Sequence, residues 1–229
     1  MAMVLDKVVP FGRSMDEYSK MFNLTHTDLN KKIIGIGDGP ASFNAEMTLQ
    51  GKSVISVDPL YQFSAKEILA RFNEVIDFII DQVKATPNDW VWSYHKSPED
   101  LRQNRVKVIE KFIADYEKGK QNHRYIIGGL PNLDYQNKEF NLALCSHFLF
   151  LYADHFDYDF HLKSIAEMLR IAQEVRIFPL LTLMSKPAPY LDEIVNHYTS
   201  AGYIVEIVKV DYELQLGANM MLKIARKYN

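Results

Sequence analysis

Residues 33–46 read IIGIGDGPASFNAE and contain the pattern that decides the fold. The first four residues are mostly isoleucine, which is β-branched and apolar and is typical of a buried strand. Gly35, Gly37 and Gly39 alternate through the stretch, and glycine has no side chain to obstruct a sharp turn. Helix-forming residues follow, so the stretch predicts a strand, a glycine turn and the start of a helix.

The same rhythm continues beyond the glycine turn. Residues 41–50 predict a short helix that Gly51 can end, and residues 53–59 (SVISVDP) predict a second strand that ends at Asp58. A strand, a helix and a second strand in this order form a βαβ unit, and such units build parallel sheets. Ligands of open α/β sheets bind beyond the carboxyl ends of the strands, so Asp58 and the glycine turn mark a candidate binding edge.

The composition limits the class of protein. The chain has 229 residues, of which 48% are hydrophobic, and a net charge of -3, which suits a globular core and does not indicate a nucleic-acid partner. Cys145 is the one cysteine of the sequence and can form no internal disulfide, as is typical of a reducing compartment. The sequence has no signal-peptide pattern at its start and no apolar run long enough to span a membrane. We therefore expect a cytoplasmic protein with no nucleic-acid or membrane partner.

Residues 61–122 interrupt the βα rhythm with two long helical patterns. The first begins with a capping box formed by Ser64 and Glu67, and the second has its own serine cap followed by proline. Gly119 is the expected end of the second helix. The segment therefore predicts a helical insertion that carries an aromatic stretch, WVWSYHK, between its helices.

The alternating pattern returns after residue 122 and ends in two strands, residues 203–210 and 219–226, with no helix between them. Two consecutive strands of this kind can pair antiparallel at one side of a sheet. We therefore predict an α/β fold with a doubly wound, seven-stranded, mostly parallel sheet whose last strand is antiparallel. The helical insertion at about residues 61–122 falls between the second and third strands, and residues 1–229 are expected to form a single domain.

The glycine turn alone leaves the ligand open. No Gly-Lys-Ser/Thr sequence follows the turn, so a P-loop is excluded. Gly37 and Gly39, with Ser42 at the later small position, also fit a nicotinamide-binding fingerprint, and Asp58 can accept hydrogen bonds from ribose hydroxyls of either kind of cofactor. These residues by themselves indicate a nucleoside-type ligand and no particular chemistry.

Three stretches in combination resemble the successive motifs of the class I S-adenosylmethionine-dependent methyltransferases, which have a Rossmann-like fold. They are residues 33–43 (IIGIGDGPASF), 54–61 (VISVDPLY) and 130–152 (LPNLDYQNKEFNLALCSHFLFLY). The paired strands at the C-terminal end resemble the closing hairpin of the same fold. The resemblance implies a transferase that moves a methyl group from S-adenosylmethionine to a small molecule or a protein side chain, mainly by positioning.

The resemblance also implies roles for individual residues. It implies that one set of residues contacts the cofactor along its length, from the methionine part to the adenine. These residues are Gly35, Gly37, Asp38, Gly39, Ser146, Asp58, Pro59, Leu60, Gly129 and Leu130. Members of the family usually carry an acid at the place of Gly35, two positions before the first turn glycine, and Asp38 is the candidate to replace it. Arg13, before the sheet, can pair with a carboxylate such as the one at the methionine end of the cofactor. An ordinary solvated arginine is the alternative interpretation of Arg13.

The candidates for catalysis and substrate binding are less specific. His147 follows Ser146 at the end of the fourth strand and is the candidate general base, although a hydrogen-bonded structural histidine fits equally well. The substrate contacts are predicted to be Trp92, Tyr94, His95 and Tyr152. Core filling between the two helices, or a contact in a homodimer, is the alternative for the aromatic stretch. No spacing of histidines and acids predicts a metal site.

Three classes of function remain open on this evidence. The first is a methyltransferase that uses S-adenosylmethionine. The second is an NAD(P)-dependent oxidoreductase, and the third is a non-catalytic nucleotide-binding protein with the same fold.

Overall fold

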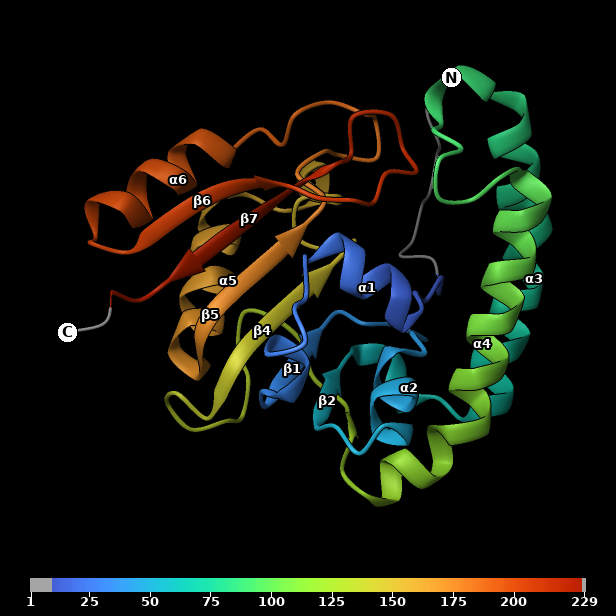
Figure 1. Cartoon of the computed structure of the whole chain (residues 1–229), viewed down its shortest axis with the longest axis horizontal. Helices are drawn as coiled ribbons and strands as arrows, with labels where there is room; N and C mark the ends of the chain where they lie inside the picture. The colour runs from blue at the N-terminus through green and yellow to red at the C-terminus, as the bar shows by residue number, and fades with distance from the viewer. Residues whose placement is uncertain (1–9, 228–229) are drawn as a thin grey trace.

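The computed structural model describes residues 10–227 of the chain, which form a seven-stranded sheet in the order β3-β2-β1-β4-β5-β7-β6 (Figure 1). The strands are β1 Ile33–Ile36, β2 Val54–Val57, β3 Tyr125–Ile126, β4 Phe140–Ser146, β5 Ala172–Phe178, β6 Ile204–Lys209 and β7 Met220–Ala225. Neighbouring strands pair parallel except at β7, which pairs antiparallel with both β5 and β6. The predicted mostly parallel sheet with an antiparallel last strand is therefore confirmed.

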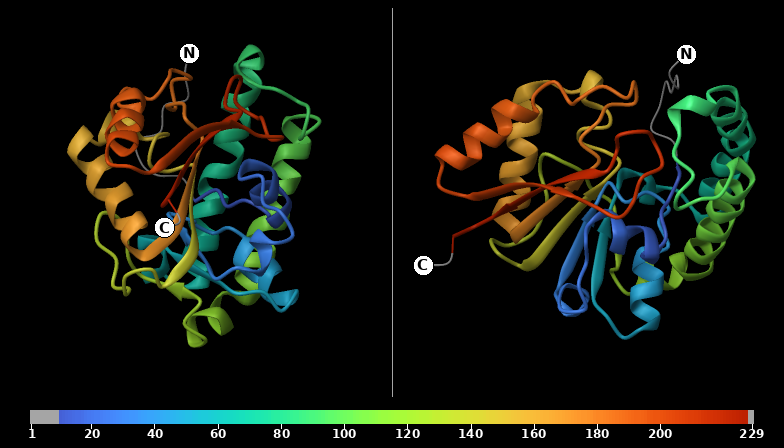
Figure 2. Two further views of the ribbon diagram at one scale, coloured as in Figure 1. Left: turned by 60° about the vertical axis from the view of Figure 1, so that its left-hand side comes forward. Right: turned by 45° about the horizontal axis from the view of Figure 1, so that its top comes forward.

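Helices cover both faces of this sheet (Figure 2). The α-helices of the described residues are α1 Met15–Met21, α2 Phe43–Leu49, α3 Ala65–Ala85, α4 Pro98–Gln121, α5 Tyr158–Ile171 and α6 Leu191–Ser200. Short 3₁₀ helices are η1 Asp28–Asn30, η2 Pro59–Gln62, η3 Pro87–Asp89 and η4 Ala153–His155. No helix within residues 10–227 is long and apolar enough to cross a membrane.

The alternation of side chains along the central strands builds two cores. Successive residues of a strand point to opposite faces of the sheet. Ile34 and Cys145 accordingly pack in the core that includes α5 and α6, and Ile33 and Leu144 pack in the core that includes α1 and α2. Because both faces are covered, the carboxyl edge of the strands is the part of the sheet that can hold a ligand.

The predicted helical insertion is present between β2 and β3. Its two helices, α3 and α4, lie side by side and run in opposite directions (Figure 1). The capping box at the start of α3 is formed as predicted, with the Glu67 carboxylate accepting from the Ser64 backbone N–H at 2.8 Å. Gly119 does not end α4, which continues to Gln121. Its role is in packing, because a Cβ at Gly119 would lie 2.2 Å from the Tyr125 ring and only glycine fits there.

Candidate functional site

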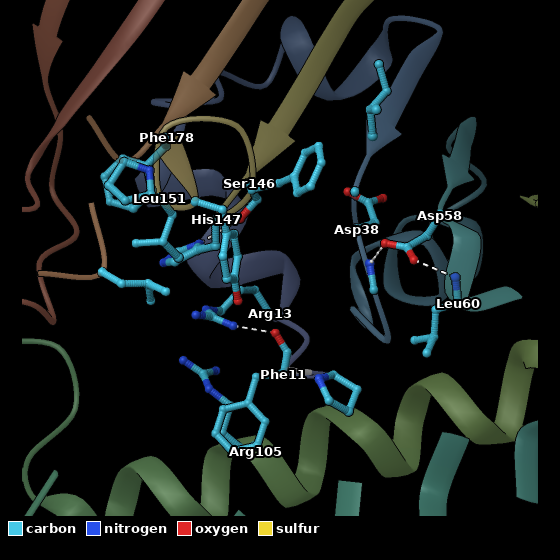
Figure 3. Close-up of a pocket in the computed structure, with 18 of the residues that line it drawn as sticks. Phe11, Arg13, Asp38, Asp58, Leu60, Arg105, Ser146, His147, Leu151 and Phe178 are labelled. Carbon is cyan, nitrogen blue, oxygen red and sulfur yellow. Dashed lines mark hydrogen bonds between the residues drawn. The ribbon is translucent and has the colours of Figure 1, made fainter. Parts of the chain in front are cut away.

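A cavity of about 410 Å³ opens at the carboxyl edge of the sheet. This volume lies in the range of small-molecule binding sites. Its walls come from the ends of β1, β2, β4 and β5, from α3 and α4, and from the segment before α1 (Figure 3). The sequence-predicted residues that line it are Arg13, Gly37, Asp38, Gly39, Asp58, Pro59, Leu60, Gly129, Leu130, Ser146, His147 and Tyr152.

Asp58 organises the part of the cavity nearest β2. Its carboxylate accepts hydrogen bonds from the backbone N–H groups of Gly39 (2.8 Å) and Leu60 (2.7 Å). Each carboxylate oxygen keeps a further lone pair, so Asp58 can still accept from hydroxyl groups of a ligand. Burial raises the pKa of Asp58 above its ordinary value, and the two backbone donors oppose this rise. The side chain is therefore fixed in place and retains capacity for a ribose.

Small residues keep the neighbouring walls open. Gly37 and Gly39 have φ of +69° and +53°, in the left-handed region that favours glycine. A Cβ at Gly37 would lie 3.1 Å from the Phe148 side chain, and a Cβ at Gly129 would lie 3.4 Å from the Pro59 ring. All three glycines line the cavity, so their backbone is within reach of a ligand.

Asp38 takes the space that Gly35 leaves empty. A Cβ on Gly35 would lie 2.0 Å from the Asp38 carboxylate, and Gly35 itself does not line the cavity. The prediction that Gly35 contacts the cofactor is thus corrected: its role is to make room for Asp38. The buried Asp38 carboxylate accepts from the hydroxyls of Tyr18 and Ser56, each at 2.6 Å. Burial raises the pKa of Asp38 to about 6.

His147 stands at the opposite part of the cavity, directly after β4. It is a non-glycine residue with φ of +52°, and its backbone N–H donates to the Phe178 carbonyl at 2.7 Å. Strained backbone of this kind is concentrated at functional sites. The Nδ1 atom lies 2.9 Å from Oγ of Ser146. Burial, and then the charges of Arg13 and Arg105, hold the pKa of His147 well below its ordinary value, so the imidazole is neutral at pH 7.

The half-buried Arg13 and the buried Arg105 form the floor beside His147, and the buried Glu17 pairs with Arg105. Nη1 of Arg105, on α4, lies 2.8 Å from Oε1 and 3.0 Å from Oε2 of Glu17, on α1. Glu17 also accepts from the Tyr212 hydroxyl at 3.1 Å and from the Ser14 backbone at 2.8 Å. Burial works against ionisation of Glu17, yet Arg105 and the other donors hold its pKa far below the ordinary value. Arg13 lines the cavity next to this pair and donates to the Phe11 carbonyl.

Arg105 and Glu17 were missed from the sequence, although one signal pointed to Arg105. Its neighbours at i−4, i+3 and i+7, which are Leu101, Val108 and Phe112, are all buried along one stripe of α4. A charged residue on such a stripe must be paired or must face a cavity. Arg105 does both.

The aromatic stretch of the insertion is placed differently from the prediction. Trp92, Tyr94 and His95 do not line the cavity. Tyr94 donates to Asp16 at 2.7 Å, the buried His95 lies 3.4 Å from Glu17, and Trp92 packs against the core between α3 and α4. Substrate contact is therefore not retained for these three residues, because their side chains join the insertion to α1 or fill its core. Trp90, from the same stretch, lines the cavity instead.

The sequence has a relative of nearly the same length. An uncharacterized protein of Methanocaldococcus jannaschii is 34% identical over 223 residues, which are 97% of this chain and 98% of the relative. The chain belongs to the family of this archaeal protein. No protein-family model matches the chain.

Solved structures with a similar fold include two methyltransferases. Magnesium protoporphyrin IX methyltransferase from Synechocystis, with bound S-adenosylmethionine, is 12% identical, with 88% of this chain and 73% of that chain covered and a TM-score of 0.47. An O-methyltransferase family protein from Burkholderia thailandensis is 10% identical, with 94% and 55% covered and a TM-score of 0.48. These likenesses concern the fold alone. The fold class that the resemblance implied, a seven-stranded and mostly parallel sheet whose last strand is antiparallel, is the one observed.

Proposed function

We propose that the protein is an S-adenosylmethionine-dependent methyltransferase that acts on a small molecule. The observation that carries this proposal is that one cavity joins the Asp58 and glycine-turn wall to the His147 wall. The first wall suits a nucleoside, and the second offers a neutral imidazole and cationic groups. The walls between them come from the insertion and are mostly apolar, which suits a small molecule better than a protein side chain.

The strand order favours this function over an oxidoreductase. Dinucleotide-binding sheets of the Rossmann type have the order 3-2-1-4-5-6. In this chain the antiparallel β7 lies between β5 and β6. A nicotinamide-dependent reaction is therefore the weaker proposal, even though Asp58 alone would serve either cofactor.

The residues at the cavity fit the cofactor. Asp58 has lone pairs for the ribose hydroxyls, the backbone of Leu130 and the Pro59 ring border the place for an adenine, and the left-handed glycines give close access. Arg13 has a buried Nε atom without a hydrogen-bond partner among the described residues, which suits the methionine carboxylate. When bound, S-adenosylmethionine would supply an electrophilic methyl group.

His147 is the proposed proton acceptor for the substrate. A neutral imidazole can take a proton from a hydroxyl or amine as this group attacks the methyl. The Ser146 hydroxyl at 2.9 Å from Nδ1 fixes the ring and leaves Nε2 for the substrate. If the acceptor atom carries no proton to lose, His147 serves only to orient it.

Two measurements test the proposal. Calorimetry on the purified full chain should show binding of S-adenosylmethionine and S-adenosylhomocysteine, and tighter binding of NADH than of either would overturn it. Methyl-labelled S-adenosylmethionine is then incubated with the protein and with separated small-molecule and protein fractions of a cell extract. Label in a small-molecule fraction is expected. Label in protein would overturn the substrate class, and cofactor binding without any transfer would indicate the non-catalytic alternative.

A further inference from the structure

At the end of the cavity beside His147, two guanidinium groups face one carboxylate, whereas the carboxylates that line the cavity itself, Asp38 and Asp58, belong to the opposite wall (Figure 3). Arg13 and Arg105 both line this end. Burial and then the charge of Arg105 lower the pKa of Arg13, and burial and then the charges of both arginines lower the pKa of His147. Glu17 is the carboxylate that pairs with Arg105 there. An excess guanidinium in a buried place is costly unless an anion compensates it. The floor is therefore suited to an anionic ligand group.

Arg105 also has an unused donor. Its Nη1 atom bonds Glu17 and the Asn104 amide oxygen, at 2.8 Å for the latter. Its Nη2 atom is buried and has no hydrogen-bond partner among the described residues. The Tyr212 hydroxyl, which donates to Glu17, still has lone pairs that face the Arg105 guanidinium. Burial lowers the pKa of Arg105, but Glu17 and then Tyr212 raise it. The whole Arg105 side chain is only 1% exposed, so bulk water does not satisfy the Nη2 donor. A buried donor of this kind normally has a partner.

The position of Arg105 separates it from the nucleoside wall. Figure 3 shows Arg105 beyond Arg13, on the far side of the cavity from Asp58 and Leu60. Apolar side chains from several elements line the same cavity; they are Trp90, Leu101, Leu151, Phe178, Leu183 and Leu214. A ligand at this end would thus place an apolar body against these walls and an anionic group on Arg105.

We infer that the methyl acceptor is a small carboxylic acid with an apolar body, and that Arg105 binds its carboxylate. The inference rests on the proposed function, in which Arg13 takes the carboxylate of the cofactor. Arg105 is then left for a second carboxylate, from the acceptor. A guanidinium binds a carboxylate through two parallel hydrogen bonds and with a preference over a neutral amide of the same shape.

The test compares acids with their amides on the full chain saturated with S-adenosylhomocysteine. Indole-3-acetate, 3-phenylpropanoate and octanoate are titrated at pH 7.5, each beside its primary amide. We expect at least one acid to bind tenfold or more tightly than its amide. A preference below threefold for all three acids would overturn the inference, while cofactor binding in the same samples reports separately on the proposed function.

A double variant assigns the preference to Arg105. Glu17→Gln with Arg105→Gln neutralises both members of the buried pair, so neither charge is left unpaired, and melting temperature checks that the chain folds. The acid preference should fall below threefold. Arg102→Gln, on the exposed side of the same helix, should keep it. If the double variant keeps the preference, Arg105 is not the carboxylate-binding residue.

The cofactor itself is the competing occupant of Arg105. S-adenosylhomocysteine carries a carboxylate, and 5′-deoxy-5′-methylthioadenosine has the nucleoside and thioether without it. The double variant should bind S-adenosylhomocysteine and 5′-deoxy-5′-methylthioadenosine each with an affinity within threefold of that of the unchanged protein. A loss of tenfold or more for S-adenosylhomocysteine alone would show that Arg105 holds the carboxylate of the cofactor, and would overturn the inference.

Discussion

Asp58 connects the glycine turn to the start of η2 through two backbone hydrogen bonds. Its replacement by alanine removes a charged acceptor from the proposed ribose hydroxyls, which costs about 1.5–3 kcal/mol of binding free energy. We expect Asp58→Ala to weaken S-adenosylmethionine binding roughly tenfold to a hundredfold, as measured by calorimetry. Asp77→Asn, on the exposed face of α3, is the control. Unchanged affinity in Asp58→Ala would remove Asp58 from the site.

Asp38 should make the stability of the protein depend on pH. Burial raises its pKa to about 6 in the folded chain, from an ordinary value of 3.8. The folded state therefore holds this proton more tightly, and the associated stability is present below pH 4 and is lost as pH rises through about 6. From pH 4.5 to 7.5 the loss amounts to about 2 kcal/mol.

The contribution of Asp38 to the free energy of unfolding is measured by urea unfolding of the unchanged protein and of Asp38→Asn at pH 4.5 and pH 7.5. Other groups titrate equally in both proteins, so the difference between their free energies of unfolding isolates Asp38. The unchanged protein should gain about 2 kcal/mol relative to the variant on going from pH 7.5 to 4.5. Parallel pH profiles would contradict a raised pKa for Asp38.

His147 gives a prediction that separates two roles. If its imidazole accepts a proton, His147→Ala should lower kcat by roughly a hundredfold or more, with unchanged affinity for S-adenosylhomocysteine. If the ring only orients the acceptor, KM should rise more than kcat falls. Steady-state kinetics with the acceptor found in the labelling experiment distinguish the two. A His147→Ala variant with kinetics like those of the unchanged protein would exclude both roles.

At the scale of single elements, Gly119 is a test of how α4 is packed. In an exposed helix, glycine to alanine stabilises by about 1 kcal/mol. Here the added Cβ would lie 2.2 Å from the ring of Tyr125, whose hydroxyl is tied to Asp115 at 2.9 Å. Overpacking of this kind costs about 1–3 kcal/mol, so Gly119→Ala should lower the free energy of unfolding. Lys118→Ala, its neighbour, should change it little; a stabilised Gly119→Ala would contradict this packing.

The elements themselves were largely predictable, and the side-chain directions of the loops were not. Runs of β-branched residues predict strands such as β1 and β2. The ends of these strands, at Gly37 and Asp58, fall on one edge of the sheet because parallel strands share a direction. Tyr94 and His95 lie in a segment without periodicity, so nothing local indicated that they face α1 instead of the cavity. The apolar spacing around Arg105 indicates a buried stripe of α4, but only the packed structure shows that this stripe meets Glu17 of α1.

For the whole molecule, the cavity couples ligand binding to stability, because its walls come from segments far apart in the sequence. They include the segment before α1, the insertion, and the loop before β7. A ligand that binds only the folded chain stabilises it by about 2.7 kcal/mol at a hundredfold excess over Kd. For a domain of this size, 1 kcal/mol corresponds to about 2–4 °C in Tm. S-adenosylhomocysteine at this excess should thus raise Tm by roughly 5–11 °C.

Hydrogen exchange should show where this stabilisation is distributed. Backbone amides that line the cavity, at residues 37–39, 58, 60, 62, 63, 129 and 130, should exchange more slowly with S-adenosylhomocysteine bound, because local opening of these segments would break contacts with the ligand. Amides of α6 lie outside the cavity and serve as the internal control. Their exchange should slow only at amides that exchange through global unfolding. NADH at the same concentration should leave both Tm and exchange unchanged. Equal protection by NADH would instead favour the dinucleotide-binding alternative, since the Asp58 wall would then be serving a ribose of either cofactor.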